Sequence, residues 1–384
     1  MAAACALLCS ATPAGAVSPR ELTGVNFEGR IQPVVADGFI YSADGDSYAS
    51  PEQSIAVSKT DLLTGVKTVA FRMRRGRDLT GLQASGSMLA YSFSYPSKRG
   101  FRSKVVVRRP DGSESVVASA IAHVTKHSKH RCGRYVAIAA VSDTGAAAWQ
   151  RIALSQSAKH PRCNDYRGMR FKVKHEVRKA GGVVRALLGW RRLTLSEWFY
   201  WADSGNSQVS GLQGDYALFW ERRDRLREIN FVTGKVRAIA ANSGRRVADA
   251  AAALGPNGEV LAARESGRNG KSMRSIYLYP APGAPGAPLL LDTRRASLGS
   301  SAQFCGSRIV VAGNTYHSFQ AQLRGLDGAV TSELLGTGSA PSPGTFYRAV
   351  CSGTTYVVSY AERTAGDTNY EGDESLKALV VDLP

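Results

Sequence analysis

The sequence predicts an all-β protein, a β-propeller of about seven four-stranded blades, because two patterns repeat along it. The first pattern is an apolar strand that begins just after a glycine. The spacing of these glycines is 44–48 residues in every interval but the one from Gly133 to Gly214. A propeller blade occupies about 40–50 residues. The seven glycines are Gly38, Gly86, Gly133, Gly214, Gly258, Gly306 and Gly353.

The second pattern is an alternating or apolar run that ends in a glycine turn, later in each repeat. Thr64-Gly65, Asp111-Gly112, Thr233-Gly234 and Asp327-Gly328 are examples. Tight hairpins require positive φ angles, which glycine adopts readily. Each blade therefore consists of an inner strand, a glycine turn, a second strand, a variable loop, a third strand, a glycine hairpin and an outer strand.

The two ends of the chain carry complementary partial blades. KALVVDLP (377–384) is typical of a third strand with no outer strand after it, and LTGVNFEG (22–29) has no inner strand before it. Pairing of these segments would complete the last blade and close the ring, which removes exposed strand edges.

The long interval after Gly133 is interpreted as one blade with an insertion. RIALSQS (151–157) is predicted as its third strand, followed by a basic insertion at about 156–195 within a single domain, 17–384. The alternative is an eighth, degenerate blade near Gly181-Gly182. Only a short stretch then remains before Gly214 for four strands.

The third-strand and turn pattern IAVSKTDLLTGVKTVAF (55–71) resembles those of the TolB-like and WD40-like propellers of bacterial envelopes. The resemblance extends over nearly the whole chain after residue 16, through a generic repeat. It implies a propeller fold and an envelope-associated binding role, and it implies no reaction. The Trp-Asp dipeptide of WD40 blades is absent from the sequence.

The first 16 residues are typical of a secretory signal. They carry no charge, contain an apolar stretch and end in Ala14-Gly15-Ala16, which predicts cleavage before Val17. No later stretch has the roughly 18 apolar residues that a membrane-spanning helix needs. We therefore expect a secreted or envelope-associated protein without a transmembrane segment.

Removal of the signal leaves four cysteines, an even number that suits an oxidising compartment and predicts two disulfides. Cys305 and Cys351 occupy equivalent positions in adjacent blades, just ahead of the second strand. Cys132 and Cys163 lie near the same face of one blade, so we favour the pairs Cys132–Cys163 and Cys305–Cys351. Four cysteines allow three connectivities, and their spacing does not choose among them.

The formal net charge of +18 is concentrated in one part of the chain, because residues 98–192 contain 22 lysines and arginines but only 5 acidic residues. In a propeller, the loops between second and third strands emerge on the same face as the connections between blades. Basic residues at these places predict a cationic loop face that binds anions. The candidates are Arg74, Arg75, Arg77, Lys98, Arg99, Arg102, Arg222, Arg223, Arg245, Arg246, Arg294 and Arg295.

The sequence favours a non-catalytic binding or scaffold propeller of the cell envelope, a monomer whose partner is an anionic envelope polymer. Two alternatives stay open: a lyase or hydrolase that acts on acidic polysaccharide, and a protein–protein interaction domain. No G-x-S-x-G motif is present, and no catalytic residue is assigned. Export argues against nucleic acid as the physiological ligand.

We expect no cofactor and no metal site. The cluster of His127, His130, Cys132, His160 and Cys163 has metal-binding residue types, but lysines and arginines interleave with it and raise the cost of adding a cation. One group of aromatic residues has two interpretations. Its members form a sugar-stacking platform, or they fill the space between blades. The second interpretation is favoured because aromatic residues on strands are usually buried. The residues are Trp190, Trp198, Phe199, Tyr200, Trp201 and Trp220.

Overall fold

In the part of the chain that the computed structural model describes, 28 β-strands are arranged in seven four-stranded sheets. Six sheets are each formed by four consecutive strands, and the remaining sheet combines β26–β28 with β1. The structure describes residues 20–22, 31, 33–44, 54–98, 100–123, 133–156, 169–193, 209–222, 225–241, 252–266, 273–295, 300–314, 319–334, 346–352, 355–362 and 375–382.

The strands follow one another with the same order in each blade, from the innermost to the outermost strand. In the first half of the chain they are β1 (Arg20–Leu22), β2 (Val34–Ala36), β3 (Phe39–Asp44), β4 (Ala56–Asp61), β5 (Lys67–Arg72), β6 (Asp78–Ser85), β7 (Met88–Ser97), β8 (Gly100–Arg108), β9 (Glu114–His123), β10 (Gly133–Val141), β11 (Ala147–Gln156), β12 (Met169–Arg178) and β13 (Val184–Leu193). In the second half they are β14 (Val209–Gln213), β15 (Tyr216–Arg222), β16 (Arg225–Asn230), β17 (Val236–Ala241), β18 (Ala252–Leu254), β19 (Val260–Ser266), β20 (Met273–Tyr279), β21 (Leu289–Arg295), β22 (Ser300–Cys305), β23 (Arg308–Asn314), β24 (Phe319–Arg324), β25 (Val330–Leu334), β26 (Phe346–Ser352), β27 (Thr355–Glu362) and β28 (Ser375–Asp382).

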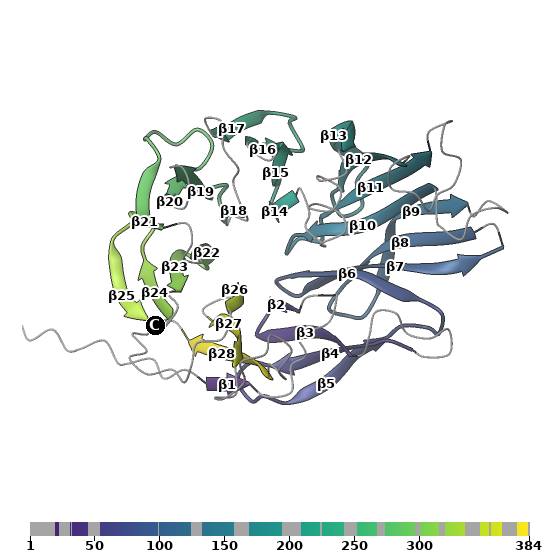
Figure 1. Cartoon of the computed structure of the whole chain (residues 1–384), viewed down its shortest axis with the longest axis horizontal. Helices are drawn as coiled ribbons and strands as arrows, with labels where there is room; N and C mark the ends of the chain where they lie inside the picture. The colour runs from purple at the N-terminus through teal and green to yellow at the C-terminus, as the bar shows by residue number, and fades with distance from the viewer. Residues whose placement is uncertain are drawn as a thin grey trace, which may run out of the picture.

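The sheets are arranged as a ring around a central axis, so the predicted all-β propeller is confirmed (Figure 1). The innermost strands contact one another in the order β2, β6, β10, β14, β18, β22, β26 and back to β2. The chain ends close the ring as expected, because β1 pairs antiparallel with β28. The N-terminal segment that pairs is Arg20–Leu22, which shares only Leu22 with the expected segment 22–29.

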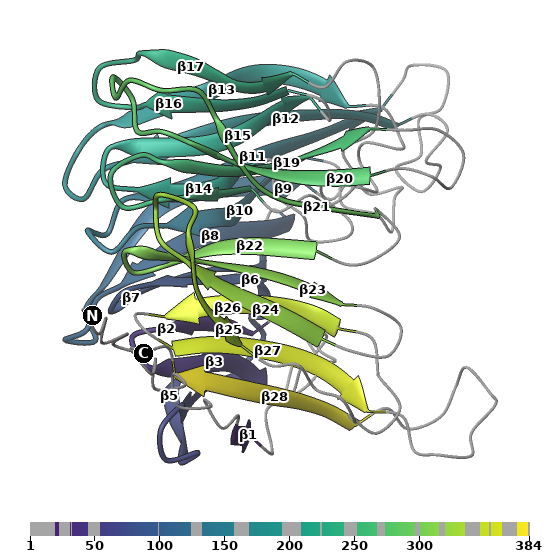
Figure 2. The same ribbon diagram turned by 90° about the vertical axis from the view of Figure 1, so that its left-hand side faces the viewer.

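Antiparallel order within each blade separates two kinds of connection. The turns between first and second strands and between third and fourth strands lie at one end of the sheets, which we call the turn face (Figure 2). The strand ends that the remaining connections join lie at the opposite end, the loop face. The predicted hairpin glycines Gly65, Gly112, Gly234 and Gly328 all have positive φ, between 72° and 83°.

The predicted blade at Gly133 is wrong in its strand order. Gly133 begins the innermost strand β10, and Gly145 occupies the turn between first and second strands, with φ of 80°. RIALSQS therefore belongs to the second strand, β11. Residues 169–193 form β12 and β13, the third and outer strands of the same blade, and are not an insertion. The turn at Gly181-Gly182 joins these two strands, so the alternative of an eighth blade is also wrong.

The hydrophobic core lies between neighbouring sheets. Val105 of one sheet and Val136 and Trp149 of the next belong to one buried cluster, and Val177 packs in another cluster with Phe219 of the following sheet. Each blade thus buries both faces of its inner strands, where burial of apolar surface contributes roughly 25 cal/mol per Å². The outer strands diverge from their neighbours and leave side chains in solvent, including Val116, Val184 and Trp190.

The predicted disulfide Cys305–Cys351 is confirmed. It joins the innermost strands β22 and β26 of adjacent blades, with the two Cα atoms 5.3 Å apart, inside the range of roughly 4.4–6.8 Å for disulfides. Cys132 and Cys163 lie outside the described residues, and so does the expected signal, 1–16.

The described part of the chain contains no helix that is long and apolar enough to cross a membrane.

Candidate anion-binding surface

The predicted loop-face cations whose side chains the structure describes lie where the first two blades meet. Arg74, Arg75 and Arg77 belong to the connection from β5 to β6, and Lys98 and Arg102 flank the connection from β7 to β8. Four of these side chains are exposed, and Arg77 is half-buried. Between Lys67 and Arg109 the sequence contains a single acidic residue, Asp78. This end of the blades therefore carries a local excess of positive charge.

An aromatic ladder positions the cations of this region. Phe71 of β5 stacks on Tyr91 of β7, with ring centroids 4.8 Å apart, and the stack continues along β7 through Phe93 to Tyr95 at spacings of 6.0 and 5.8 Å. Rings that share one side of a strand stand at alternate positions, which gives this spacing. The ladder forms part of the packing between the first two blades.

Three cations lie over the rings of this ladder. The guanidinium of Arg77 is 4.7 Å from the centroid of Phe93, that of Arg108 is 5.3 Å from Phe71, and the ammonium of Lys104 is 5.8 Å from Tyr95. Cation–π contacts of this kind contribute about 0.5–1 kcal/mol at exposed sites. Arg108 is also paired with the Glu114 carboxylate at 2.8 Å, at the turn end of β8. For Arg77 and Lys104, the contacts hold the charged groups in place without neutralising them.

Tyr91 contributes no charge to this surface. Burial, followed by the negative charge of Glu114 and a hydrogen bond to it, raises the pKa of Tyr91 above its usual range. The ladder is therefore a neutral support for cations at neutral pH.

The other seven predicted anion-binding residues are not placed beside Arg74, Arg75, Arg77, Lys98 and Arg102 in the described part of the structure. Arg222, Arg294 and Arg295 end strands β15 and β21 at the loop face, and their side chains are outside the description. Arg99, Arg223, Arg245 and Arg246 lie wholly outside the described residues. The predicted ring of cations therefore remains a prediction beyond the first two blades.

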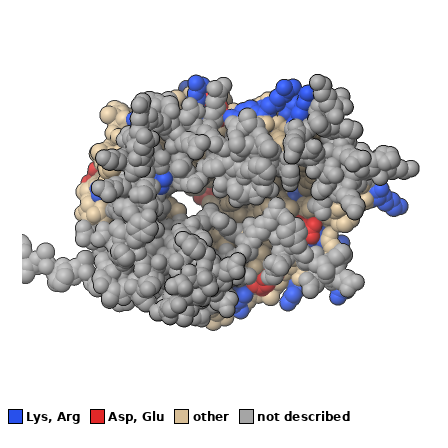
Figure 3. Space-filling model, viewed as in Figure 1, with Lys and Arg blue, Asp and Glu red and all other residues tan. Residues whose placement is uncertain are grey.

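A second cationic surface, which the sequence analysis assigned to an insertion, lies on the sheet β10–β13. Figure 3 shows Lys and Arg side chains gathered along the upper rim of the molecule, where β12 and β13 lie in Figure 1. The sheet has two sides, which we name by their neighbours: the β14 side faces sheet β14–β17, and the β6 side faces sheet β6–β9.

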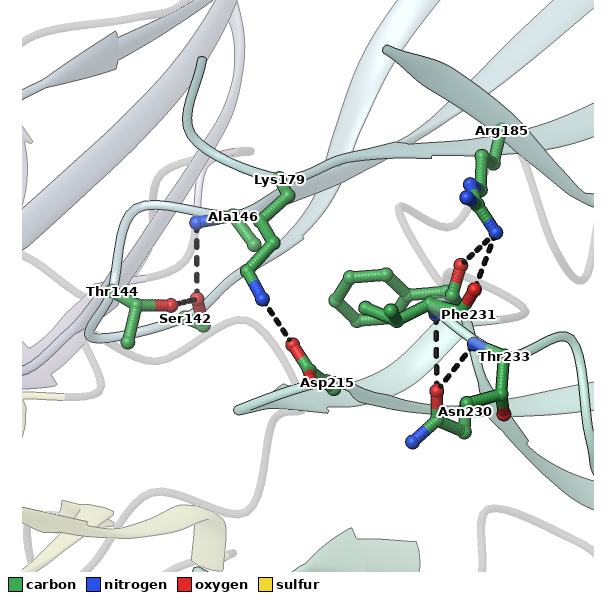
Figure 4. A network of polar contacts seen from close by, with 10 residues as sticks. Ser142, Thr144, Ala146, Lys179, Arg185, Asp215, Asn230, Phe231 and Thr233 are labelled. Atoms are coloured by element: carbon green, nitrogen blue, oxygen red, sulfur yellow. Dashed lines mark hydrogen bonds and ion pairs between the residues drawn. The ribbon is translucent and has the colours of Figure 1, made fainter. Parts of the chain in front are cut away.

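The cations on the β14 side bond to the next blade (Figure 4). The Arg185 guanidinium donates to the carbonyl oxygens of Phe231 (3.1 Å) and Val232 (2.6 Å), and Arg191 donates to the carbonyl oxygen of Glu221. At the turn, the ammonium of Lys179 lies 2.7 Å from the Asp215 carboxylate. These charges connect blades.

The same arginine position recurs in the following blade. Arg237, the second residue of β17 as Arg185 is of β13, donates to the carbonyl oxygen of Pro280 at 2.6 Å and lies 2.7 Å from the buried Glu228 carboxylate. The recurrence indicates that part of the basic composition serves to join blades rather than to bind a ligand.

The β6 side is organised around Glu176. Its carboxylate accepts hydrogen bonds from the Trp149 indole at 2.8 Å and from Arg151 at 3.1 Å, and it lies 3.0 Å from the Lys174 ammonium. Arg151 also donates to the carbonyl oxygen of Ser119 in β9. Burial raises the pKa of Glu176, but its hydrogen bonds with Lys174, Trp149 and Arg151 outweigh this and lower it overall.

Beyond this cluster, the β6 side of β12 and β13 presents cations to solvent. Lys172 lies directly opposite Arg192 in the pairing of β12 with β13, and Arg170 is two residues before Lys172 on the same side. All three side chains are exposed. Among the described residues, no carboxylate forms an ion pair with any of them.

His175 is buried on the β14 side and is 1% exposed. Burial, assisted by the positive charge of Arg191, lowers its pKa to about 3, so the ring is neutral at ordinary pH. Among the described residues, no group of three or more His, Cys, Asp or Glu side chains is arranged to hold a metal ion. All five residues of the cysteine–histidine cluster lie outside the described residues.

The predicted group of aromatic residues contains both a side chain packed between blades and a side chain exposed to solvent. Trp220 is buried, as expected for packing between blades, but Trp190 on β13 is 44% exposed. Residues 198–201 lie outside the described residues. For Trp190, the expectation that these aromatics fill the space between blades is wrong.

Comparison with protein-family models finds no match. Comparison with curated protein sequences also finds none. Several solved structures are similar over most of their length. They include BamB from Moraxella catarrhalis (11% identity, TM-score 0.39, 95% of this chain and 99% of that chain) and the polysaccharide lyase Uly1 (10% identity, TM-score 0.47, 94% and 91%). A chain of a mitotic checkpoint complex is 10% identical with a TM-score of 0.46, covering 100% and 99%.

These neighbours include β-propeller proteins, with which the resemblance to TolB-like and WD40-like propellers is consistent.

Proposed function

We propose that this protein is an exported, non-catalytic propeller that binds an anionic polymer of the cell envelope through its loop face. The observation that supports this most is the group of cations at the junction of the first two blades. Arg74, Arg75, Lys98 and Arg102 are exposed there, and Arg77 is held on the aromatic ladder. A cluster of like charges on one face attracts polyanions, whereas evenly spread charges mainly aid solubility.

The proposal is tested by retention of the purified protein on immobilised polymers at increasing salt. Teichoic-acid-like polymers, polyuronates and a neutral glucan of similar length are compared. Binding that depends on several charges weakens steeply with salt, because ionic screening shortens to about 10 Å at 0.1 M. We expect retention on the acidic polymers and none on the glucan.

The decisive variant is the double charge reversal Arg74→Glu/Arg75→Glu. Its matched control is Arg109→Glu/Lys235→Glu, which changes the net charge equally at exposed positions on the turn face. Loss of retention in the first variant alone supports the loop face. Equal loss in both variants would show a non-specific effect of net charge, and no retention of the wild type at low salt would overturn the proposal.

A further inference from the structure

The exposed side of β12 and β13 combines two features that a carbohydrate with acidic groups requires. One is an aromatic ring open to solvent, and the other is a set of cations around it. We propose that this surface binds a carboxylate-bearing polysaccharide, with a sugar ring packed on Trp190 and carboxylates bound by Arg170, Lys172 and Arg192. The proposal concerns a different blade from the loop-face site and does not depend on it.

The strand pairing places these residues on one side of the sheet. Phe171, Val173 and Val177 are buried, and Val177 packs against the next blade, so the odd-numbered residues of β12 face the β14 side. Lys172 therefore projects on the β6 side. Arg192 lies directly opposite Lys172 and shares that side. Trp190 lies in the register shift between Val173 and His175, so no pairing partner fixes its side. Its side follows from its neighbour Arg191, which is partly buried on the β14 side, whereas Trp190 and Arg192 are both exposed.

The cations of this surface have no competing use in the described structure. Glu176 is the only acidic residue within strands β10–β13, and Lys174, Arg151 and Trp149 already contact its carboxylate. On the β14 side of the same sheet, by contrast, Arg185 and Arg191 are engaged with backbone carbonyls. Arg170, Lys172 and Arg192 are left as exposed positive charges.

The spacing suits a chain-like ligand. Alternate residues of one strand are roughly 7 Å apart, and neighbouring strands are about 4.8 Å apart. Arg170 and Lys172 along β12, with Arg192 beside them on β13, therefore form an extended positive surface next to the indole. A linear polymer with one carboxylate on each sugar contacts several of these charges at once.

The indole selects carbohydrate over other polyanions. An exposed tryptophan offers a flat apolar ring, on which the C–H groups of a sugar ring pack, while its N–H remains free to meet a hydroxyl. A guanidinium binds a carboxylate through two parallel hydrogen bonds. Inorganic polyphosphate has the charge but no apolar face, so it uses the cations and not the tryptophan. Single-stranded nucleic acid also stacks on aromatic rings, and it is therefore included as a competitor in the test.

The test measures binding of the full chain to oligogalacturonate by titration calorimetry at low salt. The probes for comparison are polyphosphate of matched charge, single-stranded DNA and a neutral glucan. We expect Trp190→Ala to weaken oligogalacturonate binding about tenfold, as for a tryptophan at the centre of a contact, and to change polyphosphate binding less than about twofold. Lys172→Ala/Arg192→Ala should weaken the binding of both probes.

Val184→Ala, on the same strand and also exposed, is the matched control and should bind as the wild type does. The inference is overturned if the wild type does not bind oligogalacturonate, if Trp190→Ala binds unchanged, or if that variant loses polyphosphate or DNA binding to the same extent. Arg74→Glu/Arg75→Glu separates the two proposals. If it alone abolishes oligogalacturonate binding, the ligand binds at the loop face and this inference fails. If only the Trp190 and Arg192 variants do, this inference stands and the loop face does not bind oligogalacturonate.

Discussion

The two sides of the sheet β10–β13 carry the same residue types and use them differently. On the β14 side, Arg185 and Arg191 donate hydrogen bonds to carbonyl oxygens of the next blade. On the β6 side, Lys172 and Arg192 lie opposite each other in solvent. The charge of a segment therefore does not measure its capacity to bind a ligand. Strand alternation divides one run of cations into a set that joins blades and a set that is free to meet an anion.

The same difference separates two tryptophans, and it gives the largest expected effect. Trp149 is 0% exposed and its indole donates to Glu176, whereas Trp190 is 44% exposed. We expect Trp149→Ala to lower the free energy of unfolding by about 3–5 kcal/mol, because it leaves a cavity between blades. Trp190→Ala should change it by less than about 0.5 kcal/mol. Urea unfolding followed by circular dichroism measures both, and equal losses would contradict the comparison.

The pH dependence of stability tests the burial of the β14 side. His175 has its pKa lowered from 6.5 to about 3, so folding favours the neutral ring. This contribution is complete above pH 6.5 and is lost as the pH falls towards 3, by at most about 1.4 kcal/mol for each pH unit. His175→Leu should flatten that part of the curve between pH 6.5 and 4.5. Urea midpoints at several pH values give the two slopes, and parallel slopes would show that His175 is not held neutral.

Removal of a single blade-joining arginine should have a moderate effect. Arg185→Ala leaves the carbonyl oxygens of Phe231 and Val232 without this donor. Because the Arg185 side chain is exposed and water can replace it, we expect a loss of about 0.5–1.5 kcal/mol, the net value of an ordinary hydrogen bond. Arg192→Ala, on the same strand but the opposite side, should cost less than about 0.5 kcal/mol. Thermal or urea unfolding of the two variants compares the sides directly. A larger loss for Arg192→Ala would reverse the assignment.

The smallest effect is expected at the exposed pair Lys179–Asp215. Its atoms are 2.7 Å apart, but the side chains are 53% and 39% exposed. Lys179→Ala should therefore cost only about 0.2–1 kcal/mol at low salt, and less at 0.5 M salt, where screening is stronger. Unfolding of the wild type and the variant at both salt concentrations is the measurement. A loss that does not change with salt would indicate packing by the lysine stem instead.

The repeat of the glycine turns was sufficient to predict the propeller and its strand order outside the blade β10–β13. The partial blades at the two ends of the chain predicted that these ends pair, although the N-terminal strand is Arg20–Leu22 and not 22–29. These features follow from local chemistry, since positive φ is required at Gly65, Gly112 and similar positions, whatever surrounds them. The blade β10–β13 was misread because Gly133 and Gly145 both precede apolar runs. Its strands β11, β12 and β13 each have ten residues, so the usual spacing failed there.

The site was less predictable than the fold. Positions such as Arg74 and Lys98 could be placed on the loop face from topology alone. The roles of Arg185 and Lys172 depend on which side of a strand each occupies, and that required the correct register of β12 with β13. The disulfide Cys305–Cys351 was predictable because both cysteines occupy the same position of the repeat in adjacent blades.

That disulfide has a consequence for how the ring opens. The closing sheet depends on β1, a strand of three residues that pairs with β28. Short terminal strands detach at a low cost in free energy, so this sheet is a natural starting point for local unfolding and proteolysis. Cys305–Cys351 anchors β26 of that sheet to the preceding blade. Detachment of β1 exposes the edge of β28, while the disulfide still holds β26 to the preceding blade. Reduction of the disulfide removes this covalent link.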